Sequence, residues 1–153
     1  MPAELSITLP RDRASPSAAR HAVRLYVGPG DKRNSDLALV ITELVTNAVV
    51  HGRGRITLTL RRDGRCIQGE VADEGSGFEP NMRKQGPHDY SGRGLSIVDA
   101  LSSRWGVLEG STQVWFELGP PDQPVTASAF ACERQCRVCV DAAACVSSTI
   151  VGA

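Results

Sequence analysis

The chain has 153 residues, 41% of them hydrophobic, with 17 basic and 17 acidic side chains that cancel. This length and composition predict one domain built around a single core. Zero net charge gives no support for nucleic-acid binding through a basic surface, and no apolar run approaches membrane-spanning length. The N-terminal segment lacks the basic-then-apolar order of a secretion signal, so we expect a cytoplasmic protein with no direct nucleic-acid or membrane partner.

The first third of the chain predicts a strand followed by two helices. Apolar and polar residues alternate over residues 5–9, as they do in a half-buried strand. Ser15 directly before Pro16 is a helix-start signal, in which we expect the serine hydroxyl to cap the helix. Apolar residues then recur every three or four positions over residues 35–50, which predicts a second helix that ends at Gly52.

The next part of the chain predicts four more strands and one more helix. The strands are expected at 55–62, 65–73, 104–110 and 112–119. The helix is expected at 95–101, after a long polar segment rich in glycine. This order predicts an α+β protein, a two-layer α/β sandwich in which a mixed, mostly antiparallel sheet carries helices on one face.

Glu43 and Asn47 lie one turn apart on the second predicted helix. Successive helical residues are about 100° apart, so these two side chains point about 40° from each other, beside the edge of the apolar stripe. An amide oxygen at such a position could bind Mg²⁺, which prefers oxygen ligands, and a carboxylate could orient or deprotonate a hydroxyl. Taken alone, however, a Glu and an Asn in a helix usually belong simply to its solvated side.

Asp73 ends the predicted strand 65–73 with the same side-chain parity as the apolar residues Ile67 and Val71. Side chains alternate across a strand, so this carboxylate should face the helices and needs a partner there. The exocyclic amine of a purine would serve, although a strand-end Asp is often only a turn residue. Gly75 and Gly77 follow and leave room for a planar ring against the backbone.

Two further features come at the end of the glycine-rich segment and after it. Gly92 and Gly94 stand immediately before the helix predicted at 95–101, and such a turn offers free backbone N–H groups to phosphates. A single glycine pair is a weak signal, because glycines are ordinary loop residues. Thr112 has the parity of the apolar residues on the last strand, so it should join Asp73 on the inner face.

Taken together, "ELVTNAVVHG", "DEGSGF", "GRGLSIV" and "TQVWFEL" form an ordered series. This series resembles the Bergerat ATP-binding fold shared by gyrase, histidine kinases and bacterial anti-sigma factor kinases, over roughly Leu5 to Leu118. The resemblance implies Glu43 as the catalytic base, Asn47 as a Mg²⁺ ligand and Asp73 as the adenine reader. It further implies ATP and Mg²⁺ as cofactors. The remaining nucleotide-binding positions implied are Gly75, Gly77, Gly92, Arg93, Gly94, Leu95 and Thr112.

The length of the chain indicates which subgroup of this family it resembles. With 153 residues there is no room for a transducer domain, and only one short helix precedes the Glu43 helix. The chain is therefore similar to the small stand-alone anti-sigma factors that are serine-protein kinases. That similarity implies γ-phosphoryl transfer to a Ser or Thr of an anti-anti-sigma-type partner and control of a sigma factor. Nucleotide-dependent binding of the sigma factor without turnover is the alternative, and a homodimer is expected only by resemblance.

The last 34 residues differ from the rest in composition. Prolines begin a linker at Pro120, so we expect an ATP-binding domain at 1–119 and a disordered tail at 120–153. The tail holds four of the five cysteines, namely Cys132, Cys136, Cys139 and Cys145. These thiols could instead hold zinc or an iron–sulfur cluster, and the tail could also be a partner-binding segment.

Overall fold

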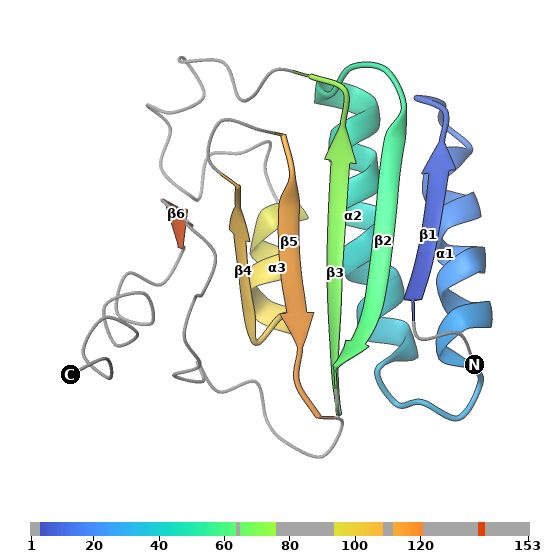
Figure 1. The fold of residues 1–153 in the computed structure, drawn as a ribbon, viewed down its shortest axis with the longest axis vertical. Helices are drawn as coiled ribbons and strands as arrows, with labels where there is room; N and C mark the ends of the chain where they lie inside the picture. The colour runs from blue at the N-terminus through green and yellow to red at the C-terminus, as the bar shows by residue number, and fades with distance from the viewer. Residues whose placement is uncertain (1–3, 64, 76–93, 109–111, 121–137, 140–153) are drawn as a thin grey trace.

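A computed structural model describes residues 4–63, 65–75, 94–108, 112–120 and 138–139 (Figure 1). The predicted strands and helices of residues 4–118 are all present, with boundaries shifted by a few residues. In chain order the elements are β1 (Glu4–Leu9), α1 (Ser15–Val27), α2 (Asn34–His51), β2 (Ile56–Asp63), β3 (Cys66–Asp73), α3 (Gly94–Leu101), β4 (Arg104–Val107), β5 (Val114–Leu118) and β6 (Val138–Cys139).

The strands form one sheet in the order β1-β2-β3-β5-β4-β6. The helices α1, α2 and α3 all lie on the same face of this sheet (Figure 1). The predicted two-layer α+β fold is therefore confirmed. Every strand pair in the described part of the chain is antiparallel, so the sheet is more regular than the mixed one expected.

The core fills the space between the helices and the sheet. In β2, residues Ile56, Leu58 and Leu60 are fully buried while the intervening threonines face away, which is the alternation of a sheet covered on one side. Phe116 of β5 reaches across β3 at Gly69, where a Cβ would clash with the phenyl ring. The glycine in the middle of β3 thus makes room for the largest fully buried side chain.

Helix α1 begins differently from the sequence prediction. The sequence predicts Ser15 as the cap of the helix, but Ser15 is the first helical residue, is 2% exposed, and makes no capping hydrogen bond. Its hydroxyl donates instead to the carbonyl oxygen of Pro10. The turn before the helix is closed by Asp12, whose Oδ1 accepts from the Ala14 N–H at 2.7 Å. Ser15 faces inward because the chain must turn from β1 into α1 against the core.

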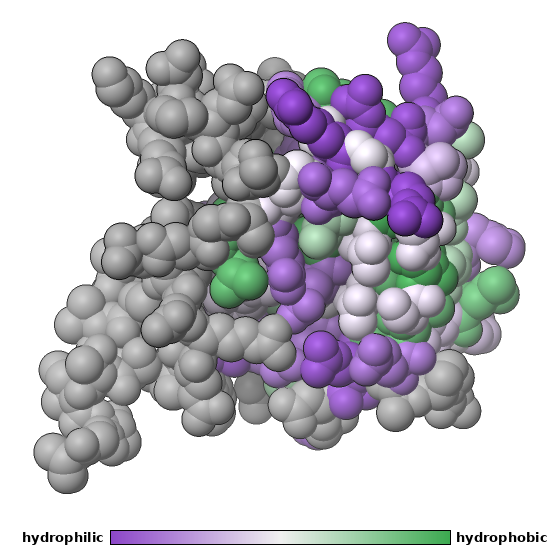
Figure 2. Space-filling view, turned by 45° about the horizontal axis from the view of Figure 1, so that its top comes forward, coloured by the Kyte–Doolittle hydropathy of each residue, from purple (hydrophilic) through white to green (hydrophobic). Residues whose placement is uncertain are grey.

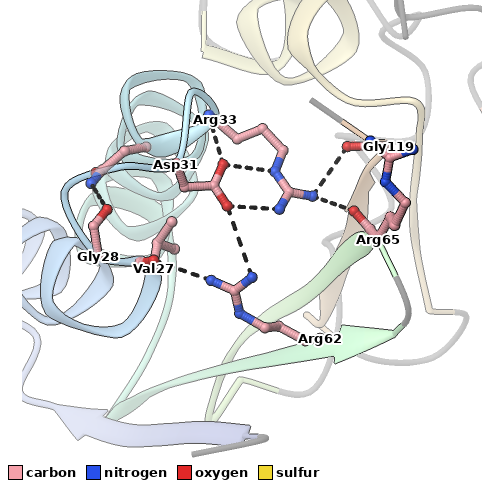
Figure 3. Close-up of polar contacts among 8 residues, drawn as sticks. Val27, Gly28, Asp31, Arg33, Arg62, Arg65 and Gly119 are labelled. Carbon is pink, nitrogen blue, oxygen red and sulfur yellow. Dashed lines mark hydrogen bonds and ion pairs between the residues drawn. The ribbon is translucent and has the colours of Figure 1, made fainter. Parts of the chain in front are cut away.

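A buried arginine joins the α1–α2 connection to the start of β3 and the end of β5 (Figure 3). Arg33 is 8% exposed and donates through Nε and Nη2 to the two carboxylate oxygens of Asp31, at 2.9 and 2.7 Å. Its Nη1 donates to the carbonyl oxygens of Arg65 and Gly119. Arg62 also approaches Asp31 at 3.9 Å and donates to the Val27 carbonyl oxygen. Three segments distant in sequence are therefore held by one guanidinium.

The tail falls mostly outside the described residues. Within it, the two residues of β6 pair antiparallel with β4, so Cys139 lies opposite Gly106. The other three tail cysteines, Cys132, Cys136 and Cys145, lie outside the described residues, so the disordered, metal-binding and partner-binding interpretations stay predictions, as does the domain boundary at 119. Among the described residues, none of the three helices has the length and apolar composition of a membrane-spanning segment.

We expect Arg33→Ala to lower the free energy of unfolding by about 3 kcal/mol, because it leaves a buried carboxylate and two carbonyl groups without their donor. Denaturant unfolding followed by circular dichroism measures the change. Arg61→Ala is the control, since its ion pair with Glu4 is 3.5 Å long and both side chains are about half exposed. The control should change stability by less than about 0.5 kcal/mol, and equal losses would contradict a special role for Arg33.

Asp31 should make part of this stability depend on pH. Its side-chain hydrogen bonds with Arg33 hold the pKa of Asp31 below its ordinary value of 3.8. A lowered pKa in the folded state stabilises the fold above the unfolded-state pKa, and this contribution is lost as the pH falls through the folded-state pKa. The stability gap between wild type and Asp31→Asn should therefore be constant above about pH 5 and shrink below about pH 4. Unfolding titrations across this range would contradict the assignment if the gap did not change.

Candidate functional site

Helix α2 presents Glu43 and Asn47 at the edge of its buried face. Both side chains are half-buried, and the neighbouring residues Leu44 and Ala48 belong to the core. Among the residues that the structure describes, no side-chain hydrogen bond is made by Glu43 or Asn47. Two polar side chains one turn apart thus lie near the core and have no hydrogen-bond or ion-pair partner among the described residues.

Asp73 ends β3 on the face that the helices cover. It lies directly opposite Ile56 of β2, which is fully buried, and opposed residues of an antiparallel pair point to the same side. The side-chain parity of the sequence therefore predicts the correct face for this carboxylate. Helix α2 packs against β3, so Glu43, Asn47 and Asp73 come from two contacting elements.

Backbone N–H groups hold the Asp73 carboxylate. Its Oδ1 accepts from Gly75 at 2.7 Å and from Arg53 at 3.2 Å. Both bonds go to the same oxygen, and Oδ2 has no donor in the described part of the chain. Two N–H bonds fix the direction of the carboxylate, which leaves the second oxygen available to accept a hydrogen bond from a ligand.

Thr112, just before β5, fixes the backbone of Asp73. The threonine hydroxyl donates to the Asp73 carbonyl oxygen at 3.1 Å and lies 3.4 Å from the Asp73 nitrogen. The structure therefore brings Thr112 to Asp73 as the sequence predicts, although its visible contacts are with the main chain of Asp73 and not with the carboxylate.

Two glycines leave room around this carboxylate. A Cβ at Gly75 would lie 2.7 Å from Asp73 Oδ1 and 3.1 Å from the Thr112 methyl group. A Cβ at Gly52 would lie 2.5 Å from Asp73 Oδ2 and would clash with the Ala48 carbonyl oxygen. Gly52 ends α2 as predicted, but its φ is −80°, so the lack of space and not a left-handed backbone requires glycine there.

The segment 52–55, which contacts the end of β3, is a part of the site that the sequence motifs do not reveal. Arg53 supplies one of the two N–H groups on Asp73, and Glu74 bonds both Arg53 and Arg55 through their main chains. The available signal is the repeated glycine in "HGRGR", which marks a turn where side chains do not fit. Nothing in the sequence shows that this turn meets Asp73, twenty residues away.

The phosphate end of the predicted site is only partly described. Gly94 is the first residue of α3, and Leu95 is half-buried against the core. Helix α3 packs against α2, the helix of Glu43 and Asn47. Gly77, Gly92 and Arg93 lie outside the described residues, so their predicted roles stay predictions.

The described residues fit a nucleotide and its metal. Asn47 and Glu43 supply oxygen ligands or acceptors of the type that Mg²⁺ and hydroxyl groups need, and both are free of other described partners. At the other end, Asp73 Oδ2 has no described donor, and a Cβ at Gly52 or Gly75 would crowd Oδ2 or Oδ1 of this carboxylate, respectively. The arrangement can therefore recognise a donor-bearing ring at one end and a charged group at the other.

A comparison with solved structures finds the same fold. A solved structure of the RsbU and RsbW domains of Rv1364c from Mycobacterium tuberculosis is similar to this chain, with a TM-score of 0.57 and 22% identity. The similarity covers 78% of this chain but 32% of the other, so this chain spans about a third of that relative. At this identity the likeness shows the fold alone. No curated protein sequence matches the chain.

A family model gives the more specific result. The model of the histidine kinase-like ATPase domain matches residues 9–118, which runs from the end of β1 to the end of β5. This range contains α2, the Asp73 turn and α3, the elements that carry the series of motifs recognised in the sequence. The chain belongs to the family of histidine kinase-like ATPase domains.

Proposed function

We propose that this domain binds ATP with Mg²⁺ and acts as a regulatory protein kinase of the anti-sigma factor type. The observation that carries the proposal is the Asp73 carboxylate, which faces the helices with one oxygen fixed by two N–H groups and the other open. A buried-side carboxylate in this state is costly unless a ligand donor completes it. Membership of an ATPase family makes the adenine amine the donor of choice.

In this proposal Asp73 reads the base. An ionised carboxylate can only accept hydrogen bonds, and adenine offers an exocyclic amine where guanine offers a carbonyl oxygen. Gly75 leaves the space in which a flat ring can approach the backbone, and Thr112 keeps the end of β3 in place through the Asp73 main chain. The carboxylate then selects adenine over guanine because it attracts the adenine amine and repels the guanine carbonyl oxygen, and not because the two rings differ in shape.

Asn47 and Glu43 act at the phosphates. The Asn47 amide oxygen would hold Mg²⁺, whose chemistry is to neutralise negative charge on the phosphate oxygens. Glu43 accepts the proton of the attacking Ser or Thr hydroxyl. Gly94 begins α3 and would direct its N-terminal N–H groups to the phosphates, together with Gly92, Arg93 and Leu95.

The regulatory part of the proposal concerns the partners. Two facts support it: the chain resembles the small stand-alone anti-sigma kinases in its motif series, and its fold is similar to a structure that contains an RsbW domain. The partners proposed are an anti-anti-sigma-type protein that accepts the phosphoryl group and a sigma factor. Capture of the sigma factor without turnover is the competing outcome.

Asp73→Asn should weaken ATP binding by about 1.5–3 kcal/mol, because an amide replaces the charged acceptor of the adenine amine. It should also reduce the preference for ATP over GTP. Isothermal titration calorimetry with both nucleotides in the presence of Mg²⁺ measures both effects. Asp36→Asn, at an exposed position in the first turn of α2, is the matched control. Wild-type affinity in the Asp73 variant would refute the assignment of the base reader.

Glu43→Gln should slow phosphoryl transfer by roughly 10²–10⁴-fold, because it keeps the side-chain shape and removes the proton acceptor. ATP affinity should change little, since Asp73 and Asn47 are intact. Transfer of radiolabel from ATP to a phosphoacceptor protein encoded by a neighbouring gene measures the rate.

Asn47→Ala provides the contrasting variant in the same assay. It should weaken the Mg²⁺-dependent part of ATP binding and lose transfer with it. If wild-type protein binds ATP but labels no partner, the binding-only function is correct. A Glu43→Gln variant at full rate would exclude Glu43 as the base.

A further inference from the structure

Glu74, the residue after β3, makes two hydrogen bonds to the turn between α2 and β2. Glu74 Oε2 accepts from the Arg55 N–H at 2.6 Å, and the Glu74 N–H donates to the Arg53 carbonyl oxygen at 2.8 Å. The Arg55 guanidinium adds an ion pair of 3.5 Å to Glu74 Oε1. That ion pair is exposed, so the main-chain bonds hold the turn more than the charges do.

Gly54 lies at the centre of this turn and contacts Glu74 closely. Its φ is +65°, a left-handed conformation in which other residues are strained. A Cβ at Gly54 would clash with Glu74 Oε2 and lie 2.7 Å from Glu74 Cβ. The turn therefore has the shape that places a backbone N–H on the carboxylate, and glycine is required for that shape. We call residues 53–55 together with Glu74 the turn latch.

The turn latch is continuous with the proposed base reader. The Arg53 carbonyl oxygen accepts from the Glu74 N–H, and the Arg53 N–H donates to Asp73 Oδ1. The main chain of one residue therefore bonds to both acidic residues. Gly52, one residue earlier, lies against Asp73 Oδ2, and its carbonyl oxygen accepts from Arg11 Nη1 at 2.9 Å. A shift of this turn would move the groups that aim the Asp73 carboxylate.

The turn latch follows α2 directly after Gly52, the residue that caps the helix. Helix α2 carries Glu43 and Asn47, and its last residue is His51. The latch is therefore the short covalent and hydrogen-bonded path between the phosphate end and the base end of the site. It lies at the upper end of Figure 1, and Figure 2 turns this end forward and shows it covered by hydrophilic side chains. Arg53, Arg55 and Glu74 are all exposed there.

We propose that Glu74 is a positioning residue, which sets the direction of the Asp73 carboxylate, and with it adenine selectivity, by holding the turn 53–55 against the end of β3. This inference rests on the proposed nucleotide binding and adds a residue to it. Glu74 touches no base or phosphate in this scheme and acts only through the main chain of the turn.

The ionisation of Glu74 suits this role. The backbone hydrogen bond from Arg55 holds the pKa of Glu74 below its ordinary value of 4.5. The carboxylate is therefore charged at neutral pH, and an ionised acceptor makes the stronger hydrogen bond to an N–H group.

The first experiment needs no ligand. Amide hydrogen exchange followed by NMR on the full chain compares wild type with Glu74→Ala. Loss of the acceptor should increase exchange several-fold at Arg55, and also at Arg53 and Gly75, whose N–H groups bond to Asp73. Unchanged exchange at Arg53 and Gly75 would overturn the proposal, because Asp73 would then be fixed independently of Glu74. This result does not depend on whether the protein binds ATP.

The second experiment measures ATP and GTP affinity by calorimetry in the presence of Mg²⁺. Glu74→Ala should weaken ATP binding about three- to tenfold, the range of one net hydrogen bond, and should lower the ATP-to-GTP ratio. Glu74→Gln retains an acceptor and should recover most of the loss. Gly54→Ala displaces the carboxylate and should reproduce Glu74→Ala.

The matched control is Glu4→Ala. Glu4 forms an ion pair with Arg61 that has the same 3.5 Å length and similar exposure, on β1 and β2. Its removal should leave nucleotide affinity and selectivity unchanged. Arg55→Ala retains the main-chain N–H and should lose less than Glu74→Ala, and equal losses would overturn the assignment to the main-chain bond.

Two further outcomes separate the hypotheses. Equal loss of ATP and GTP affinity with a matching fall in melting temperature would reduce Glu74 to a structural role and overturn its part in selectivity. Absence of ATP binding in wild type would refute the proposed function, and the exchange experiment would then decide by itself whether the turn latch holds Asp73.

Discussion

The site depends on a carboxylate at the boundary of the core. Asp73 stands opposite the fully buried Ile56, on the face of the sheet that the helices cover. A charge at this position must be hydrogen-bonded, and the chain supplies two backbone N–H groups to a single oxygen. The glycines around it follow from the same constraint, because side chains at Gly52 or Gly75 would occupy the space next to the carboxylate.

The opposite end of the sheet is organised by a cation. Arg33 is almost fully buried, and its donors reach Asp31 and two carbonyl groups from separate segments. Buried charges of this kind contribute little net stability compared with apolar packing, but they require each segment to be in one place. The two ends of the molecule thus use the same principle with opposite charge: Arg33 orders the α1–α2 connection and the β2–β3 turn, and Asp73 orders the proposed site.

Glu43 and Asn47 lie on α2, and the C-cap of this helix, Gly52, lies against Asp73. Both α2 and β3 contribute buried residues to one packed core, so the proposed phosphate and base ends belong to the same folded unit. The turn 52–55 connects α2 to β2, and its Arg53 N–H bonds to the Asp73 carboxylate. The direction of the Asp73 carboxylate is therefore set by main-chain groups more than by side-chain charge.

Local patterns in the sequence determined the elements and the faces they bury. The three- and four-residue period of α2 and the alternation of β3 are properties of a helix and a strand alone, which is why the sequence suffices to place Glu43, Asn47 and Asp73 on their faces. The ordered motif series also identified the family that the match to residues 9–118 confirms.

The sequence did not determine which residues meet across the fold. The inward turn of Ser15, the antiparallel pairing of every described strand, the Arg33 contacts and the bond from Arg53 to Asp73 join positions distant in sequence or depend on packing around them. Only the tertiary structure decides them, because a periodic pattern records which side of an element faces the core and carries no record of the partner it meets there.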